Sequence, residues 1–211
     1  MSAVNFFFDF ISPYAYLAFK RIPEIIGSKY AINYRPVLFA GLLKHFGQLG
    51  PAEIPGKREW TFTQSLWEAR RHQIPFQLPK KHPFNPLPYL RLSLNSSKSG
   101  EAQKEACEKI FDHIWQTGMD PSTEESLNNL LEKFSGDLNP HDPDAKETLK
   151  NNTNDAIEAG VFGVPTVLVD GHLFWGFDSM DMLRHHISGD STFADYWGEA
   201  SAVGVAIERK R

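Results

Sequence analysis

The chain opens with the apolar run Val4-Asn5-Phe6-Phe7-Phe8, followed at once by Asp9-Phe10-Ile11-Ser12-Pro13-Tyr14-Ala15-Tyr16-Leu17. The run is typical of a buried strand, and an apolar helical pattern begins after Ser12-Pro13. Serine is a favoured helix N-cap, and proline is favoured at the first helical position. The stretch therefore predicts a serine hydroxyl at a helix N-terminus, where unpaired N–H groups stabilise an anion or a thiolate. Taken alone, Ser12 is most simply a helix cap.

A helix and a second strand are predicted next. Residues 13–28 carry a broad apolar helical face, with Gly27 near its end and Pro23 as a point where the helix kinks or shortens. Residues 31–37 alternate like a strand, and Pro36 must lie at a strand end. Strand, helix and strand in this order predict a right-handed crossover between two parallel strands.

We predict no strand between residues 38 and 150. Helical periodicity covers residues 57–73, 89–98, 101–117, 123–134 and 143–160. A stiff, extended connector joins the first two of these helices and contains Pro75, Pro79, Pro83, Pro86 and Pro88. No linker sets this block apart, so we expect a helical insertion of residues 38–150 within a single unit of residues 1–211.

Strand character returns near the C-terminus. Residues 165–169 and 172–175 are two short strands, and Asp170-Gly171 between them is a hairpin signal. A final helix is predicted from Ser179 to about His186, and residues 208–211 are expected to be a solvated tail. The resulting α/β order resembles a thioredoxin-like fold of the DsbA type, formed by residues 1–37 and 151–211 around the helical insertion.

Composition limits the classes of function. The chain has 211 residues, a formal net charge of −4 and 41% hydrophobic residues, which is ordinary for one globular domain. No basic block indicates a nucleic acid or an anionic membrane surface as a partner, and no apolar run is long enough to span a membrane. Cys107, the single cysteine, falls on an apolar helical face and is expected in the core. No metal site is indicated, and we expect a reducing, cytoplasmic setting.

The thioredoxin-like layout makes the missing cysteines informative. In that fold the first strand-to-helix turn carries a CxxC motif and faces a cis-proline loop, and here Ser12 and Ala15 stand in place of the two cysteines. Val164-Pro165-Thr166 resembles the cis-proline segment. Dithiol exchange needs two sulfurs, so this chain cannot perform it. The remaining hydroxyl suits an external thiolate, and glutathione is the obvious source of that thiol.

Three separated motifs make the resemblance specific. Phe8 to Ala18 resembles the opening of 2-hydroxychromene-2-carboxylate isomerases and the related kappa-class glutathione transferases. Residues 160–166 and 174–180 also resemble that family. Pro83-Phe84-Asn85-Pro86-Leu87 and Gly47-Gln48-Leu49-Gly50-Pro51 are similar to the isomerase branch. The resemblance covers most of the chain.

The resemblance implies roles for several residues. Ser12 would hydrogen-bond the glutathione sulfur and favour its thiolate. Val164, before a cis-Pro165, would pair its backbone with the cysteinyl unit, although Pro165 also fits an ordinary strand start. Phe177 and Asp178 would bind the glutamyl end, with Asp178 also a candidate N-cap. The family commonly has Arg at the position of Ser179, so an arginine contact is missing here.

Five further residues carry weaker assignments. Lys57 is a candidate carboxylate partner, for glutathione or for the substrate, and otherwise a solvated lysine; Arg58 beside it is weaker. Gln48 is a candidate glutathione-binding residue, because it stands where relatives often have Asn; otherwise it is a loop amide. Asn85 could meet a hydroxyl or carboxylate of an aromatic substrate, or form an Asx-turn. Arg91 could pair with a carboxylate of the substrate, or form a surface salt bridge.

The predicted function is a glutathione-dependent isomerase acting on a small aromatic carboxylate. The resemblance implies interconversion of 2-hydroxychromene-2-carboxylate and trans-o-hydroxybenzylidenepyruvate in aromatic catabolism, by thiolate addition, ring opening, bond rotation and loss of the thiolate. The alternative is a kappa-like glutathione transferase that conjugates electrophiles, and a third hypothesis is a non-catalytic binding protein. Members of the family often form dimers, which makes a homodimer a candidate assembly.

Overall fold

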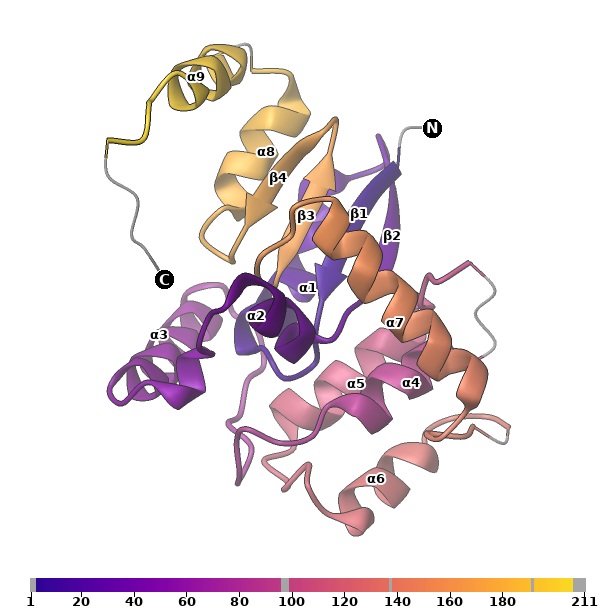
Figure 1. Ribbon diagram of the computed structural model, residues 1–211. Coiled ribbons are helices and arrows are strands. Elements are labelled where there is room, and N and C mark those ends of the chain that lie inside the picture. The colour runs from indigo at the N-terminus through magenta and orange to yellow at the C-terminus, as the bar shows by residue number, and fades with distance from the viewer. Residues whose placement is uncertain (1–2, 96–98, 137, 191, 207–211) are drawn as a thin grey trace.

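The computed structural model describes residues 3–95, 99–136, 138–190 and 192–206. Strands and helices alternate at both ends of the chain, and helices fill its middle (Figure 1). The elements are β1 Ala3–Phe8, α1 Pro13–Ile26, β2 Ala31–Pro36, α2 Phe39–Phe46, a 3-10 turn Pro51–Glu53, α3 Lys57–Arg71, α4 Leu87–Leu94, α5 Lys104–Gln116, α6 Glu124–Leu131, α7 Pro143–Glu158, β3 Thr166–Val169, β4 His172–Trp175, α8 Met180–Ser188 and α9 Thr192–Ser201.

The strands form one mixed sheet with the order β2-β1-β3-β4. β1 runs parallel to β2, with Phe6 opposite Tyr34, and antiparallel to β3, with Phe6 opposite Val167. β3 and β4 form the predicted antiparallel hairpin. The sheet confirms the predicted thioredoxin-like arrangement of a parallel pair and a hairpin.

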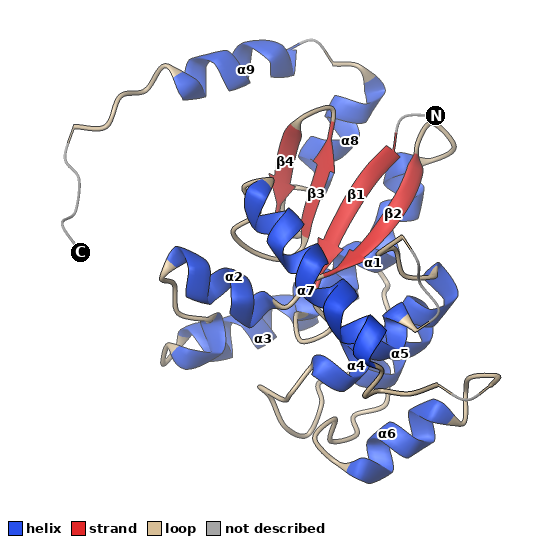
Figure 2. Ribbon diagram, turned by 45° about the vertical axis from the view of Figure 1, so that its right-hand side comes forward, coloured by secondary structure: helices blue, strands red, loops and turns tan. Residues whose placement is uncertain are grey.

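Helices cover both faces of this sheet. Figure 2 shows α7 across one face, with α1 and α8 on the other. β1 alternates accordingly, since side chains of a strand point to opposite faces. Phe6 and Phe8 belong to the large core that contains α1 and α8, whereas Phe7 packs in a smaller core with Val37 and Ala156. Because both faces are buried, β1 reads as a continuous apolar run.

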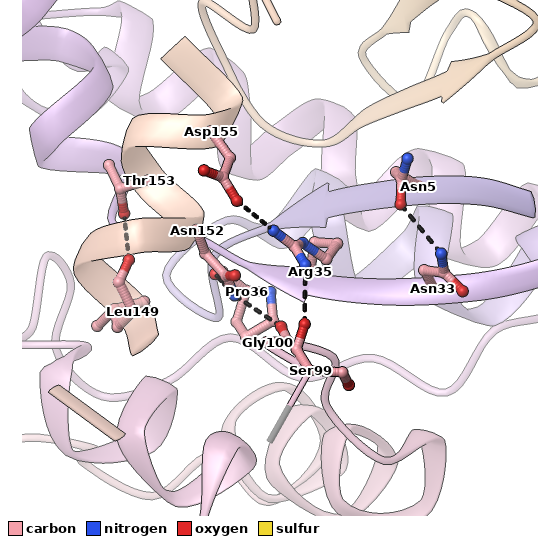
Figure 3. Close-up of polar contacts among 10 residues, drawn as sticks. All are labelled: Asn5, Asn33, Arg35, Pro36, Ser99, Gly100, Leu149, Asn152, Thr153 and Asp155. Carbon is pink, nitrogen blue, oxygen red and sulfur yellow. Dashed lines mark hydrogen bonds and ion pairs between the residues drawn. The ribbon is translucent and has the colours of Figure 1, made fainter. Parts of the chain in front are cut away.

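Polar contacts, one at the surface and two buried, fix α7 against β2 (Figure 3). The Arg35 guanidinium is 2.7 Å from the Asp155 carboxylate. The Asn152 side chain is buried and donates to the carbonyl oxygens of Pro36, at 3.1 Å, and Gly100, at 2.8 Å. Gly100 has a φ of +77°, and a Cβ there would lie 2.6 Å from Asn152 Oδ1, so only glycine fits.

The central block is helical, as predicted, but its boundaries differ from the prediction. α4 begins at Leu87 instead of Tyr89, because Pro88 occupies the first turn and needs no N–H partner there. The predicted end of that helix, at Lys98, lies outside the described residues. α5 starts three residues later than predicted, at Lys104, and Cys107 on it is fully buried, as expected. The prediction missed α2 entirely.

The predicted helix from Ser179 to about His186 is confirmed as α8, but it is not the last helix, because α9 follows it and extends away from the main body (Figure 1). Trp197 of α9 stacks on His172 with ring centroids 4.7 Å apart and meets the Phe174 ring edge-on. The predicted solvated tail, residues 208–211, lies outside the described residues. Among the described helices, none has the length and apolar character needed to cross a membrane.

A buried carboxylate holds the turn between β1 and α1. Asp9 has no exposed surface, and its Oδ1 accepts from the Ile11 N–H at 3.1 Å. Its Oδ2 accepts from the Phe39 N–H at 2.9 Å, at the first residue of α2. Burial raises the pKa of Asp9 to about 7, although both N–H groups lower it. Asp9 therefore joins two segments that are 30 residues apart.

The carbonyl groups of the same turn are satisfied by side chains of the central block. Trp115 Nε1 donates to the Phe10 carbonyl at 3.0 Å. His82 Nε2 lies 2.9 Å from the Ile11 carbonyl oxygen. A carbonyl oxygen can only accept, so His82 carries its proton on Nε2. The helical insertion thus fixes the backbone that presents Ser12.

The buried Asp9 predicts a pH dependence of stability. Its pKa is raised above the unfolded value, so the native state holds the proton more tightly, and stability falls as the pH rises from about 4 to about 7. The shift from 3.8 to about 7 corresponds to a loss on the order of 4 kcal/mol. Denaturant unfolding across this range should show that decline in the wild type and lose it in Asp9→Asn. The exposed Asp144→Asn is the control, and identical pH profiles for wild type and Asp9→Asn would contradict the assignment.

Candidate active site

Ser12 sits at the N-terminus of α1 as an N-cap. Its Oγ accepts a hydrogen bond from the Ala15 N–H at 3.2 Å, and Pro13 occupies the first turn. The side chain is largely buried, with the residue 8% exposed, but it lines a cavity. Because the oxygen accepts from Ala15, the hydroxyl proton remains available to a ligand. The plain cap and the ligand contact are therefore compatible.

The loop before β3 faces this turn. The Val164–Pro165 peptide bond is cis, as expected from the resemblance. Val164 lines the same cavity as Ser12 and also the neighbouring one. Its backbone N–H and C=O make no hydrogen bond with any described residue. Buried backbone groups normally have partners, so this edge is suited to an extended peptide that pairs with it.

The more polar of the two cavities, which we call the polar cavity, has a volume of about 390 Å³. It brings together five of the predicted residues besides Val164, namely Gln48, Lys57, Pro165, Phe177 and Asp178. The Asp178 carboxylate and the Lys57 ammonium make no hydrogen bond or ion pair with any described residue. Phe177 contributes only apolar surface to the cavity, because its ring is buried between His72 and Arg21. The cavity thus presents free charges of both signs.

The structure corrects the second role considered for Asp178. The N-cap position of α8 is Ser179, and no side chain caps that helix. A Cβ at Gly176 would collide with Asp178 Oδ1, and Gly176 has a φ of +89°. Glycine at 176 therefore makes room for the Asp178 carboxylate beside the cavity.

Sequence reasoning missed Glu68, a buried acid in the polar cavity. Glu68 is 9% exposed, and its Oε2 has no hydrogen-bond partner. His72 Nε2 is 3.4 Å and Arg71 Nη1 is 3.6 Å from this oxygen, but burial lowers the pKa of His72 and favours its neutral form, and the Arg71 side chain is largely exposed. A buried carboxylate without a full partner is costly, which suits it to a cationic ligand group. Glu68 lies in the charged stretch of α3, where the sequence looks like an ordinary solvated face.

The other cavity is mainly apolar and has a volume of about 270 Å³. Ser12, Tyr14 and Val164 line it together with the aromatic rings of Phe39, Phe62 and Phe84. Tyr14 also lines the polar cavity, and its hydroxyl donates to Gln64 Oε1 at 2.7 Å. Burial raises the pKa of Tyr14, so it keeps this proton. The two cavities therefore meet along six shared residues, Tyr14, Phe39, Leu43, Pro51, Thr61 and Val164.

Arg58 supplies the cationic group of the apolar cavity. Its Nη2 donates to the His82 carbonyl at 2.9 Å, and its guanidinium lies 5.6 Å from the Phe62 ring centroid. His82 lines the cavity as well, and burial lowers its pKa. Because its Nε2–H donates to the Ile11 carbonyl, His82 is a neutral residue that stabilises the turn and does not act as a general base.

Two predicted substrate residues lie elsewhere. Asn85 is exposed and lines neither cavity, and its Oδ1 accepts from the Leu87 N–H at 3.1 Å. It forms the alternative Asx-turn that starts α4. Arg91 lies in a separate groove between α4 and α7. The structure therefore places neither residue in the cavities beside Ser12, because a connector and a helix face do not reveal from sequence which way they pack.

The arrangement can stabilise an anion at Ser12, pair with an extended peptide at Val164, bind groups of both charges on one side, and hold an aromatic carboxylate on the other.

The family model described as a DSBA-like thioredoxin domain matches residues 3–188.

The curated relatives are enzymes of two kinds. The chain is 26% identical over 193 residues to a 2-hydroxychromene-2-carboxylate isomerase of Sphingobium xenophagum, covering 87% of this chain and 97% of the relative. It is 29% identical over 195 residues to glutathione S-transferase kappa 2 of Caenorhabditis elegans, covering 80% and 82%.

The solved structure of a 2-hydroxychromene-2-carboxylate isomerase superposes with a TM-score of 0.77 at 24% identity, covering 92% of this chain and 98% of that one. At that identity the likeness shows the fold. The sequence relatives and the fold confirm the family resemblance, and the match over residues 3–188 shows that this chain belongs to the DSBA-like thioredoxin domain family.

Proposed function

We propose that the protein is a glutathione-dependent isomerase that interconverts 2-hydroxychromene-2-carboxylate and trans-o-hydroxybenzylidenepyruvate, or a closely related aromatic carboxylate. The observation that carries the proposal is the position of Ser12. A hydroxyl at a helix N-terminus faces a free backbone edge, and a polar and an apolar cavity meet beside it. Relatives named as such isomerases support the specific reaction.

The residues of the polar cavity fit glutathione. Its ammonium group matches Asp178 and Glu68, whose Oε2 makes no hydrogen bond with a described residue. Its carboxylates match the free ammonium of Lys57 and the amide of Gln48. Its cysteinyl unit fits the unpaired backbone of Val164 as a short antiparallel contact. Gly163 leaves space for the Trp175 indole that lines the cavity, because a Cβ there would lie 2.5 Å from Trp175 Nε1.

Glutathione would supply the thiolate that adds to the conjugated ring system and later leaves. Ser12 donates a hydrogen bond at the sulfur position, and the dipole of α1 also favours negative charge there. Arg58 binds the carboxylate of the aromatic substrate, since arginine pairs with carboxylates through two N–H groups. Phe39, Phe62 and Phe84 hold the ring and exclude water. A reducing cytoplasm would keep the thiol available, and a homodimer remains a prediction.

The alternative function is a kappa-like glutathione transferase, which the kappa-class relatives support. The same thiolate would then attack an electrophile and remain bonded to it. The two functions differ in product, because the isomerase returns free glutathione and the transferase consumes it. Accumulation of a stable conjugate with a generic aryl halide, without isomerisation of the chromene, would favour the transferase.

Ser12→Ala tests the thiolate role. At saturating glutathione and neutral pH, we expect isomerisation to fall by about 10²–10³-fold, as when a charge-stabilising donor is removed from an active site. The absorbance of bound thiolate, followed against pH, should show a raised thiol pKa.

Thr123→Ala is the matched control for the lost helix cap. Thr123 Oγ1 also accepts an N–H at 3.2 Å, at the start of the remote α6. Each substitution should cost about 1 kcal/mol of stability, but only Ser12→Ala should lose activity. Full activity of Ser12→Ala, or wild-type turnover without glutathione, would overturn the proposal.

Arg58→Met tests the binding of the substrate carboxylate. Loss of a charged hydrogen bond should raise the KM for the aromatic carboxylate by about tenfold or more and leave the affinity for glutathione unchanged. Arg70→Met, at an exposed position of the same helix, is the control. Steady-state kinetics with each substrate varied in turn make the measurement, and an unchanged KM in Arg58→Met would remove Arg58 from the site.

A further inference from the structure

A second groove lies between α4 and α7, and it shares no lining residue with the two cavities of the active site. Its volume is about 310 Å³. Leu87 and Arg91 line it from successive turns of α4, while Lys146, Leu149 and Lys150 line it from α7. This spacing follows from the helix, where residues three or four apart share a face. The groove is thus built from two packed helices and not from a mobile loop.

The groove has an unbalanced positive charge. Arg91 and Lys146 form no ion pair with any described residue, and Arg91 Nε is buried without a hydrogen-bond partner. Lys150 Nζ lies 3.3 Å from Glu147 Oε1, but both groups are well exposed, so this pair neutralises little. No aspartate or glutamate is among the residues that line the groove. A buried arginine N–H without an acceptor indicates an anionic ligand.

The shape of the groove selects the kind of anion. The Nε–H and one Nη–H of arginine form a planar fork that matches the two oxygens of a carboxylate. Leu38, Leu87 and Leu149 provide apolar walls beside it. We propose that the α4–α7 groove is a second ligand site, which binds a small organic carboxylate through Arg91, with Lys146 and Lys150 flanking the charge. The sequence suggested Arg91 as a partner for a substrate carboxylate. The groove gives Arg91 a carboxylate-binding role at this second site instead.

The groove adjoins the segment that Asp9 holds. Thr153 lines the groove, and its Oγ1 donates to the Leu149 carbonyl (Figure 3) and accepts from the Leu38 N–H at 3.0 Å. The next residue, Phe39, donates to Asp9. The site nevertheless stands apart from the proposed isomerase reaction, and its test measures binding without turnover.

The test follows the Arg91 Nε–H signal by ¹H–¹⁵N NMR during titration with benzoate. We expect a saturable shift with benzoate and none with benzamide, which has the same shape but no charge. Inorganic phosphate should bind at least tenfold more weakly, because it has no apolar group that could pack against Leu38, Leu87 and Leu149. The signal is assigned by its loss in Arg91→Lys.

Variants locate the site, with the backbone amides of Lys150 and Thr153 as reporters. Arg91→Lys keeps the charge but loses the fork, and should weaken benzoate binding at least tenfold. Lys146→Met, at an exposed position, should weaken it several-fold without risk to folding. Lys44→Met, outside the groove, and Arg58→Met, in the apolar cavity, should leave it unchanged. An unmoved Arg91 signal, equal shifts with phosphate, or unaltered binding in Arg91→Lys would overturn the proposal.

Discussion

The structure depends on the carboxylate of Asp9, which connects the first strand-to-helix turn with the start of α2. Its two oxygens accept from Ile11 and Phe39, and no surface of the residue is exposed. Without this connection, the turn that carries Ser12 and the helix that walls both cavities would have no direct polar link. A buried carboxylate is unfavourable unless it is fully hydrogen-bonded, so its presence fixes one relative position of the two segments.

Local signals made most of the sheet predictable from the sequence. Ser12-Pro13 marks a helix start, Asp170-Gly171 marks a hairpin, and β1 reads as a buried strand because both of its faces are covered. α2 escaped prediction because it starts after Leu38, which offers no capping side chain, and contains Gly41. Asp9 was visible as a charge within an apolar run, but its partner Phe39 is set by tertiary structure.

The local geometry of the candidate site was predictable where the family motifs and the backbone agree, as at the Ser12 cap and the cis bond after Val164. It was not predictable where packing decides the direction of a side chain. Asn85 forms a local turn and Arg91 faces α7, so neither reaches Ser12. Glu68 looked like one of many surface charges on α3, and only its burial singles it out. Sequence patterns report the local backbone well, but the partners of long side chains depend on contacts far along the chain.

The two cavities share six lining residues, but most of their remaining walls come from different segments. The polar cavity takes charged groups from α3 and from the loop after β4, whereas the connector of residues 82–86 closes the apolar cavity. Connectors accept substitutions and changes of length more readily than helices or strands. Evolution can therefore alter the shape of the apolar cavity through this connector and leave the turn that presents Ser12 unchanged.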